Sequence, residues 1–165
     1  MRNKQKGFSL IELLIVVAII LIIAAIAIPN LLRARIAANE SSAVGSVRTI
    51  VTAEVTYSST WGTGFAATIA NLGGANPCTA AAAAACLIDP VLAAGNKSGY
   101  KLAAPGGTAV AGIVPTFAVS AVPQTVGQTG QRSFCSDESG VVRFDPLGAT
   151  TAATDTACEA LAPLQ

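Results

Sequence analysis

One carboxylate stands in an unusual place in this sequence, at the head of a long apolar run. Glu12 precedes residues 13–28, which include no charged or strongly polar side chain. Because an ionised carboxylate is costly to hold in hydrocarbon, we expect Glu12 to be either neutral or paired with a positive group. The chemistry that this position offers is a charge pair formed in apolar surroundings.

The other polar residues offer little catalytic chemistry. The chain contains no histidine, which is the commonest general base and metal ligand, and it has no glycine-rich phosphate loop or nucleophile motif. Asp137, Glu138 and Asp145 form the only acidic cluster beyond the helix, and we interpret it as a solvated turn. A calcium site is the alternative, but the spacing is unlike that of an EF-hand loop. We therefore expect a protein that is not an enzyme and holds no cofactor or metal.

The apolar run that follows Glu12 is long enough to span a membrane. Residues 8–28 number about 20, and at 1.5 Å per residue a helix of this length matches the thickness of a bilayer. A short basic leader precedes the run, with positive charges at Arg2, Lys4 and Lys6. These features predict a membrane-spanning helix with a basic leader.

A secretory signal peptide is the competing interpretation of the same segment, since Ala25-Ile26-Ala27 resembles a cleavage site. Three observations argue against it. Glu12 would fall inside the apolar region of the signal peptide, the run is longer than usual, and helical patterning continues beyond the supposed cut. We therefore favour a retained helix.

Beyond Pro29 the pattern becomes amphipathic, and apolar residues recur at spacings of three, four and seven. The expected buried stripe consists of Ile36, Ala43, Val44, Val47, Ile50, Val51 and Val55. The other faces carry Arg33, Glu40, Ser41, Arg48 and Thr52. Together the two halves predict one helix from residue 8 to about residue 55, roughly 70 Å long. Since proline removes a backbone donor and clashes with the preceding turn, we expect a kink or a local opening near residues 25–29.

The helical pattern stops after Tyr57 and gives way to turns and short strands. Residues 61–65, Trp-Gly-Thr-Gly-Phe, indicate a turn that carries two aromatic anchors. Alternating strand patterns follow at residues 100–104, 117–121, 132–135 and 141–144. We expect three or four strands in an antiparallel meander covered by the amphipathic half of the helix, and a loop over residues 145–165.

Four cysteines, Cys78, Cys86, Cys135 and Cys158, lack the Cys-x-x-Cys spacing of zinc or redox sites. An even number behind a membrane-targeting segment favours two disulfides in an oxidising compartment, with free thiols as the alternative. Four cysteines allow three connectivities. We favour Cys78–Cys86 with Cys135–Cys158, because each pair closes a loop rich in Gly, Ala or Thr.

These patterns predict an α+β fold, in which a long N-terminal helix packs on a three- or four-stranded antiparallel sheet with a disulfide-closed C-terminal loop. The expected parts are a leader (1–7), a transmembrane and assembly helix (8–28), an amphipathic helix half (29–57), a variable loop region (58–98), the meander (99–145) and a C-terminal loop (146–165). The net charge is +1, but three of the ten basic residues lie in the leader, which leaves seven against nine acidic ones. No specific binding of nucleic acid is therefore expected.

The stretch Gly7-Phe8-Ser9-Leu10-Ile11-Glu12-Leu13-Leu14 resembles the N-terminal signature of type IV pilins and of the related type II secretion pseudopilins. The short leader and Pro29 match the same pattern. The match is specific over roughly residues 5–35, and the remaining chain follows the family layout without a distinctive motif.

The resemblance implies that a prepilin peptidase cuts between Gly7 and Phe8, and that the same class of enzyme N-methylates Phe8. It further implies that Glu12 pairs with the N-terminal amine of a neighbouring subunit during assembly. The implied partners are other pilin subunits, an inner-membrane assembly platform and, before assembly, the lipid bilayer. The precursor would be a single-pass inner-membrane protein and the product a filament, extracellular or periplasmic.

Three functions are compatible with these residues. The first is the structural subunit of a type IV pilus, and the second is a pseudopilin of a type II secretion system. The cysteine-closed C-terminal loop and the lack of a clear calcium motif favour the first. The third is a monomeric binding module for which the helix serves only as a membrane tether.

Overall fold

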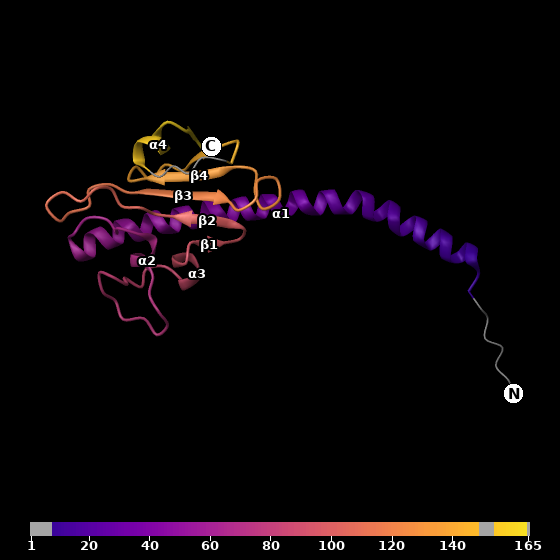
Figure 1. The fold of residues 1–165 in the computed structure, drawn as a ribbon, viewed down its shortest axis with the longest axis horizontal. Coiled ribbons are helices and arrows are strands. Elements are labelled where there is room, and N and C mark those ends of the chain that lie inside the picture. Colours follow the sequence, from indigo (N-terminus) through magenta and orange to yellow (C-terminus); the bar gives the residue numbers. More distant parts are fainter. Residues whose placement is uncertain (1–7, 149–153, 165) are drawn as a thin grey trace. The chain divides into compact units, whose positions relative to one another are not determined.

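A computed structural model of the chain describes residues 8–148 and 154–164 (Figure 1). The chain divides into two compact units, Met1–Arg35 and Ile36–Gln165. The long predicted helix is present as α1 (Leu10–Trp61), which contributes its first part to the first unit and its second part to the second unit. The α+β fold predicted from the sequence is confirmed.

In the first unit, α1 exposes almost every side chain up to Arg35. Among the described residues, α1 is the one helix that is long and apolar enough to cross a membrane. It continues through Pro29 as an unbroken α-helix. The local opening expected near this proline is therefore absent, and the expected kink stays a prediction.

In the second unit, one face of α1 is buried. Its buried residues are Glu40, Ala43, Ser46, Val47, Ile50, Ala53, Glu54 and Tyr57. The central part of the predicted stripe is confirmed, but Val55 is 54% exposed. After Ile50, the buried face of the helix continues through Glu54 and Tyr57. Val55 follows Glu54 directly, so its side chain is rotated about 100° around the helix axis from that buried position.

The C-terminal end of α1 lies beyond the predicted end. Trp61 belongs to the helix and not to a turn, and its ring stacks on that of Tyr57 with the centroids 4.9 Å apart. The helix then ends because Gly62 adopts a positive φ of 66°, a conformation that glycine adopts without the steric cost other residues meet. Two short helices follow, α2 (Ile69–Leu72) and α3 (Pro90–Ala93).

The sheet of the second unit has six antiparallel strands in chain order. They are β1 (Asn96–Lys97), β2 (Tyr100–Ala103), β3 (Ala118–Pro123), β4 (Ser133–Asp137), β5 (Arg143–Asp145) and β6 (Ala162–Pro163). The four central strands correspond to the four predicted ones. The expectation of a loop over residues 145–165 is wrong in two places, because this tail contains α4 (Asp155–Glu159) and β6.

The core of the second unit lies between the buried face of α1 and one face of the sheet. From the helix it receives Val47 and Ile50, and from the strands and their approaches it receives Tyr100, Phe117 and Phe134, all almost fully buried. Figure 1 shows strands β2 to β4 beside the second half of α1. Burial of this apolar area is the main stabilising contribution to the unit.

Candidate functional site

The first turn of α1 gives Glu12 a definite partner. The backbone N–H of Ser9 donates to Oε2 of Glu12 at 2.9 Å, and the N–H of Leu13 donates to the carbonyl of Ser9 at 3.2 Å. Ser9 is thus the N-cap residue, and the carboxylate of Glu12, three residues later, accepts a hydrogen bond from the N-cap amide. A negative charge here also interacts favourably with the positive end of the helix dipole.

This capping role was not predicted, although the Ser-x-x-Glu spacing before an apolar run is its usual signature. Phe8 precedes the N-cap and is exposed. Gly7 and the basic residues of the leader lie outside the described residues, so the expected cleavage and methylation sites stay predictions. What the described geometry provides is an exposed carboxylate one helical turn from Phe8.

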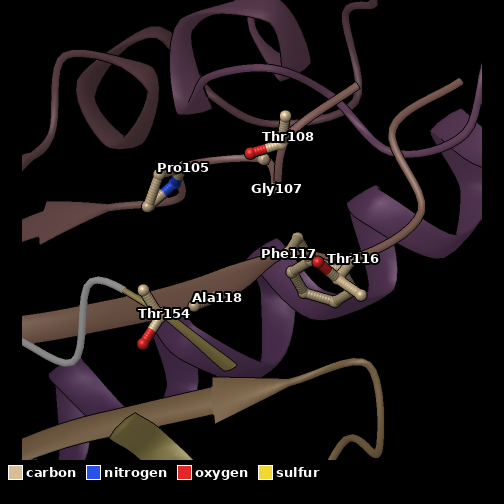
Figure 2. Close-up of a pocket in the computed structure, with 8 residues that line it drawn as sticks. Pro105, Gly107, Thr108, Thr116, Phe117, Ala118 and Thr154 are labelled. Carbon is tan, nitrogen blue, oxygen red and sulfur yellow. The ribbon is translucent and has the colours of Figure 1, made fainter. Parts of the chain in front are cut away.

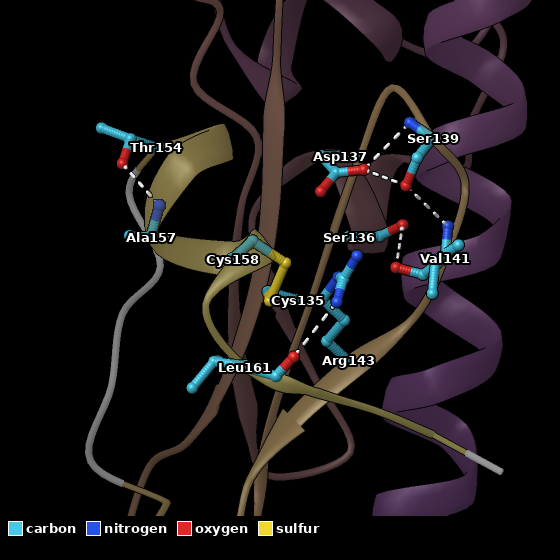
Figure 3. The surroundings of a disulfide bond; sticks show 10 residues. All are labelled: Cys135, Ser136, Asp137, Ser139, Val141, Arg143, Thr154, Ala157, Cys158 and Leu161. Carbon is cyan, nitrogen blue, oxygen red and sulfur yellow. Dashed lines mark hydrogen bonds between the residues drawn. A yellow bond between two sulfur atoms is a disulfide. The ribbon is translucent and has the colours of Figure 1, made fainter.

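Both disulfides of the favoured pairing are present. Cys78 bonds with Cys86 in the loop between α2 and α3, and Cys135 on β4 bonds with Cys158 on α4. Figure 3 shows that the second bond joins the C-terminal segment to the sheet. Both of its cysteines are buried, and the bond therefore anchors α4 against β4.

The acidic cluster is not the solvated turn expected from the sequence. Asp137 is buried and accepts hydrogen bonds from the backbone N–H of Ser139, at 2.9 Å, and from its hydroxyl (Figure 3). Asp145 is also buried and accepts from the N–H of Leu147 at 3.0 Å, whereas Glu138 is exposed. The prediction failed because both aspartates bond to the backbone of their own turns. In the part of the chain that is described, no three His, Cys, Asp or Glu residues gather to form a metal site.

The pocket in Figure 2 lies between the β2–β3 connection and the start of α4 and has a volume of about 360 Å³. Its lining includes Gly107, Thr108, Thr116 and Thr154, and none of the lining residues is ionisable. Hydroxyl groups alone supply neither a general base nor an activated nucleophile. The pocket has no group suited to acid–base chemistry.

Glu40 was predicted to lie on an outer face of the helix. This prediction is wrong, because the Glu40 side chain is buried. Its carboxylate accepts four hydrogen bonds, two from the backbone N–H groups of Gln131 and Arg132 and two from the Arg132 guanidinium at 3.0 and 2.7 Å. The guanidinium also lies 5.5 Å from the ring centres of Phe134 and Phe144. Burial alone would raise the pKa of Glu40, but these bonds outweigh it and hold the pKa below its ordinary value.

We predict that Glu40→Ala lowers the free energy of unfolding by about 2 kcal/mol, since it leaves two backbone amides and Arg132 without their acceptor. The effect is smaller than for a fully buried pair because 39% of the Arg132 side chain is exposed to water. Urea unfolding of the full chain in detergent, followed by Trp61 fluorescence, measures it. Arg48→Ala on the exposed face is the control. A loss below about 0.5 kcal/mol would contradict the prediction.

A second buried acid on α1, Glu54, was not identified from the sequence. Its side chain is fully buried, and its Oε2 accepts a hydrogen bond from the N–H of Ala66 at 2.8 Å, while Oε1 has no hydrogen-bond partner. Burial raises the pKa of Glu54 to about 7, against the smaller opposing effect of the Ala66 amide. The spacing of residues 47, 50, 54 and 57 could have placed this acid on the buried face.

Comparison with known proteins supports the resemblance at the N-terminus. The family described as the prokaryotic N-terminal methylation motif matches residues 2–28. The matched segment includes Gly7, Phe8 and Glu12. The N-terminal segment therefore carries the methylation motif to which the predicted processing site belongs.

Two curated proteins are similar to part of the chain. The type IV wide pilus major component PilA4 of Thermus thermophilus is 68% identical over 41 residues, which are 25% of this chain and 30% of that protein. The type IV major pilin protein PilA of Myxococcus xanthus is 44% identical over 54 residues, which are 33% of this chain and 24% of that protein. The similarity thus spans less than a third of the length of either relative. No solved structure matches the chain significantly.

Proposed function

We propose that the chain is a structural subunit of a type IV pilus filament, stored in the inner membrane and polymerised through its N-terminal helix. The observation that carries the proposal is the methylation motif over residues 2–28, with Glu12 at the head of an exposed apolar helix. The similarity to two major pilins supports it. Nothing in these matches favours the pseudopilin of a secretion system.

The proposed route to the filament has three steps. A prepilin peptidase cuts between Gly7 and Phe8 and N-methylates Phe8, which creates a positive amine at the end of the helix. The apolar helix holds the subunit in the inner membrane until the assembly platform extracts it. In the filament, helices of neighbouring subunits cover the surface that lipid covered before, so extraction need not expose that surface to water.

Glu12 gives this assembly its register. The methylated amine of an incoming subunit and the Glu12 carboxylate are both costly in apolar surroundings until they meet. A pair that is satisfied only at one axial position favours that position over all others. This role is structural, and no catalytic step is assigned to the chain.

The test is N-terminal mass analysis of filaments sheared from cells that produce this chain. We expect a mature chain that begins at N-methylated Phe8, whereas Gly7→Val, with a side chain in the way of the peptidase, should keep its leader. A mature chain that begins at Ile28 would indicate a secretory signal peptide and overturn the proposal. A chain that begins at Phe8 but stays in the membrane fraction would support the alternative function, a monomeric binding module that the helix tethers to the membrane.

A further inference from the structure

The two disulfides of the second unit differ in their access to solvent. Cys135 and Cys158 are both buried, and Figure 3 shows their bond enclosed between β4 and α4. In the other pair, Cys78 is exposed and Cys86 is half-buried. Because thiol–disulfide exchange requires a thiolate to reach a sulfur atom, this difference in access predicts a difference in reactivity.

An open hollow of about 220 Å³ leads to the bond between Cys78 and Cys86. Gly74 lies against this bond, since a Cβ atom added to it would be 2.0 Å from Sγ of Cys78 and 3.3 Å from Sγ of Cys86. The residues that line the hollow are Gly74, Ala75, Asn76, Cys78, Cys86, Ile88 and Pro90. None of them is acidic, so the lining of the hollow does not repel a negatively charged thiolate.

The same bond attaches residues 74–80 to the rest of the second unit. Among the described residues, this stretch takes part in no backbone hydrogen bond. Cys86 is anchored separately, because its N–H donates to the carbonyl of Gly73 at 3.0 Å. Figure 1 shows the loop between α2 and α3 extending away from the sheet. Cys78 therefore lies on the loosely attached side of the loop, and the disulfide joins it to the anchored side.

A side-chain hydrogen bond connects this loop to α1. The hydroxyl of Tyr57 donates to the carbonyl of Ala82 at 2.8 Å, and the ring of Tyr57 stacks on that of Trp61. Tyr57 is buried, so a displaced loop would leave its hydroxyl without this acceptor. The state of the disulfide is thereby connected to the C-terminal end of α1.

We propose that Cys78–Cys86 is a site of thiol exchange, at which a dithiol reductant opens the loop while Cys135–Cys158 stays closed. One thiolate of the reductant attacks the sulfur of the exposed Cys78, which forms a mixed disulfide and releases Cys86 as a thiolate. The second thiolate of the reductant then attacks the reductant's own sulfur in the mixed disulfide and releases Cys78. In total the cystine gains two electrons and two protons, and the dithiol is oxidised to a disulfide.

This site goes beyond the proposed function, since exchange takes place in the second unit and requires no filament. Reduction separates Cys78 from Cys86 and frees residues 74–80. The sheet and its buried disulfide are left in place. The loop is thus a redox-sensitive part of the surface near the C-terminal end of α1.

Differential alkylation of the full chain in detergent tests the site. The folded chain is treated with dithiothreitol for increasing times, alkylated with N-ethylmaleimide and digested with trypsin. Cleavage after Arg and Lys leaves Cys78 and Cys86 on one peptide, residues 49–97. Cys135 and Cys158 fall on two other peptides, so mass spectrometry measures the two disulfides separately.

We expect peptide 49–97 to be alkylated at least roughly tenfold faster than the peptides that carry Cys135 and Cys158, because only its disulfide is accessible. In urea, which unfolds the second unit, this preference should be lost. Equal rates in the folded chain would overturn the proposal. A preference that persists unchanged in urea would also overturn it, since the fold would then not be its cause.

The fluorescence of Trp61, the single tryptophan of the chain, tests the release of the loop. We expect its emission to shift as Cys78 and Cys86 are reduced, because Tyr57, which stacks on Trp61, loses its hydrogen-bond acceptor. Cys78→Ser with Cys86→Ser is the matched variant, which should show the shifted emission from the start and no response to dithiothreitol. Unchanged emission of the unaltered chain after full alkylation of peptide 49–97 would contradict the release of the loop.

Discussion

The full chain with Glu12→Ala is expected to reach the membrane and to be absent from filaments. The substitution leaves the amine of each incoming subunit without a partner in apolar surroundings, and breaking a buried pair in this way costs about 3–5 kcal/mol. Since each 1.4 kcal/mol is tenfold in an equilibrium constant, the assembled fraction should fall more than roughly a hundredfold. Immunoblots of sheared filaments and of the membrane fraction measure the two populations.

Glu12→Gln separates the charge of this side chain from its capping role. The glutamine amide oxygen can still accept the hydrogen bond from the Ser9 amide, but it cannot neutralise an amine. We expect this variant to assemble as poorly as the alanine variant. Filaments at normal yield from Glu12→Gln would show that Glu12 acts only as a cap. Filaments at normal yield from Glu12→Ala would contradict any role of Glu12 in assembly.

Replacing Glu54 with glutamine is expected to remove most of a pH dependence of stability in the second unit. The pKa of Glu54 rises from an ordinary 4.5 to about 7 on folding, so the folded state binds more protons than the unfolded state between these values. The contribution of Glu54 to stability is therefore largest below about pH 4.5, declines as the pH rises through 7, and is constant above. A pKa difference of this size corresponds to a change of about 3 kcal/mol in the free energy of unfolding between low and high pH.

Urea unfolding of the full chain in detergent at about pH 5 and about pH 8.5, with Trp61 fluorescence as the probe, measures this difference. Glu54→Gln should be the more stable protein at the higher pH and close to the unaltered chain at the lower one. Glu138→Gln, which changes an exposed acid, is the matched control and should follow the unaltered chain at both. The prediction would be contradicted if the free energies of unfolding of Glu54→Gln and the unaltered chain differed by the same amount at both pH values.

The sequence was sufficient wherever the determining contacts are local. The apolar run, the amphipathic stripe around Val47 and the four central strands could be predicted because each follows from a period within one segment. The end of α1 was placed too early because the stacking of Trp61 on Tyr57 and the turn at Gly62 have no periodic pattern. The edge strands β1 and β6 escaped prediction because two residues cannot display an alternation.

The polar groups within the second unit depended on distant partners and could not be assigned. Glu40 belongs to the buried face because Arg132, 92 residues away, supplies the donors that compensate its burial. No pattern around Glu40 contains that information. Glu12 was found because its surroundings are set by the adjacent apolar run. Its cap to Ser9 was missed, although the Ser-x-x-Glu spacing is local and could have been used.

In the proposed assembly, the hydrogen bond between Ser9 and Glu12 would also lower the entropy cost of subunit docking. An unrestrained long side chain such as glutamate loses roughly 1.5–2 kcal/mol of rotamer freedom when it is ordered. In α1 this loss is already incurred within the separate subunit, because the Ser9 amide holds the carboxylate at the N-terminus of the helix. An arriving amine therefore meets a pre-organised acceptor, and less of the binding free energy is spent on ordering it.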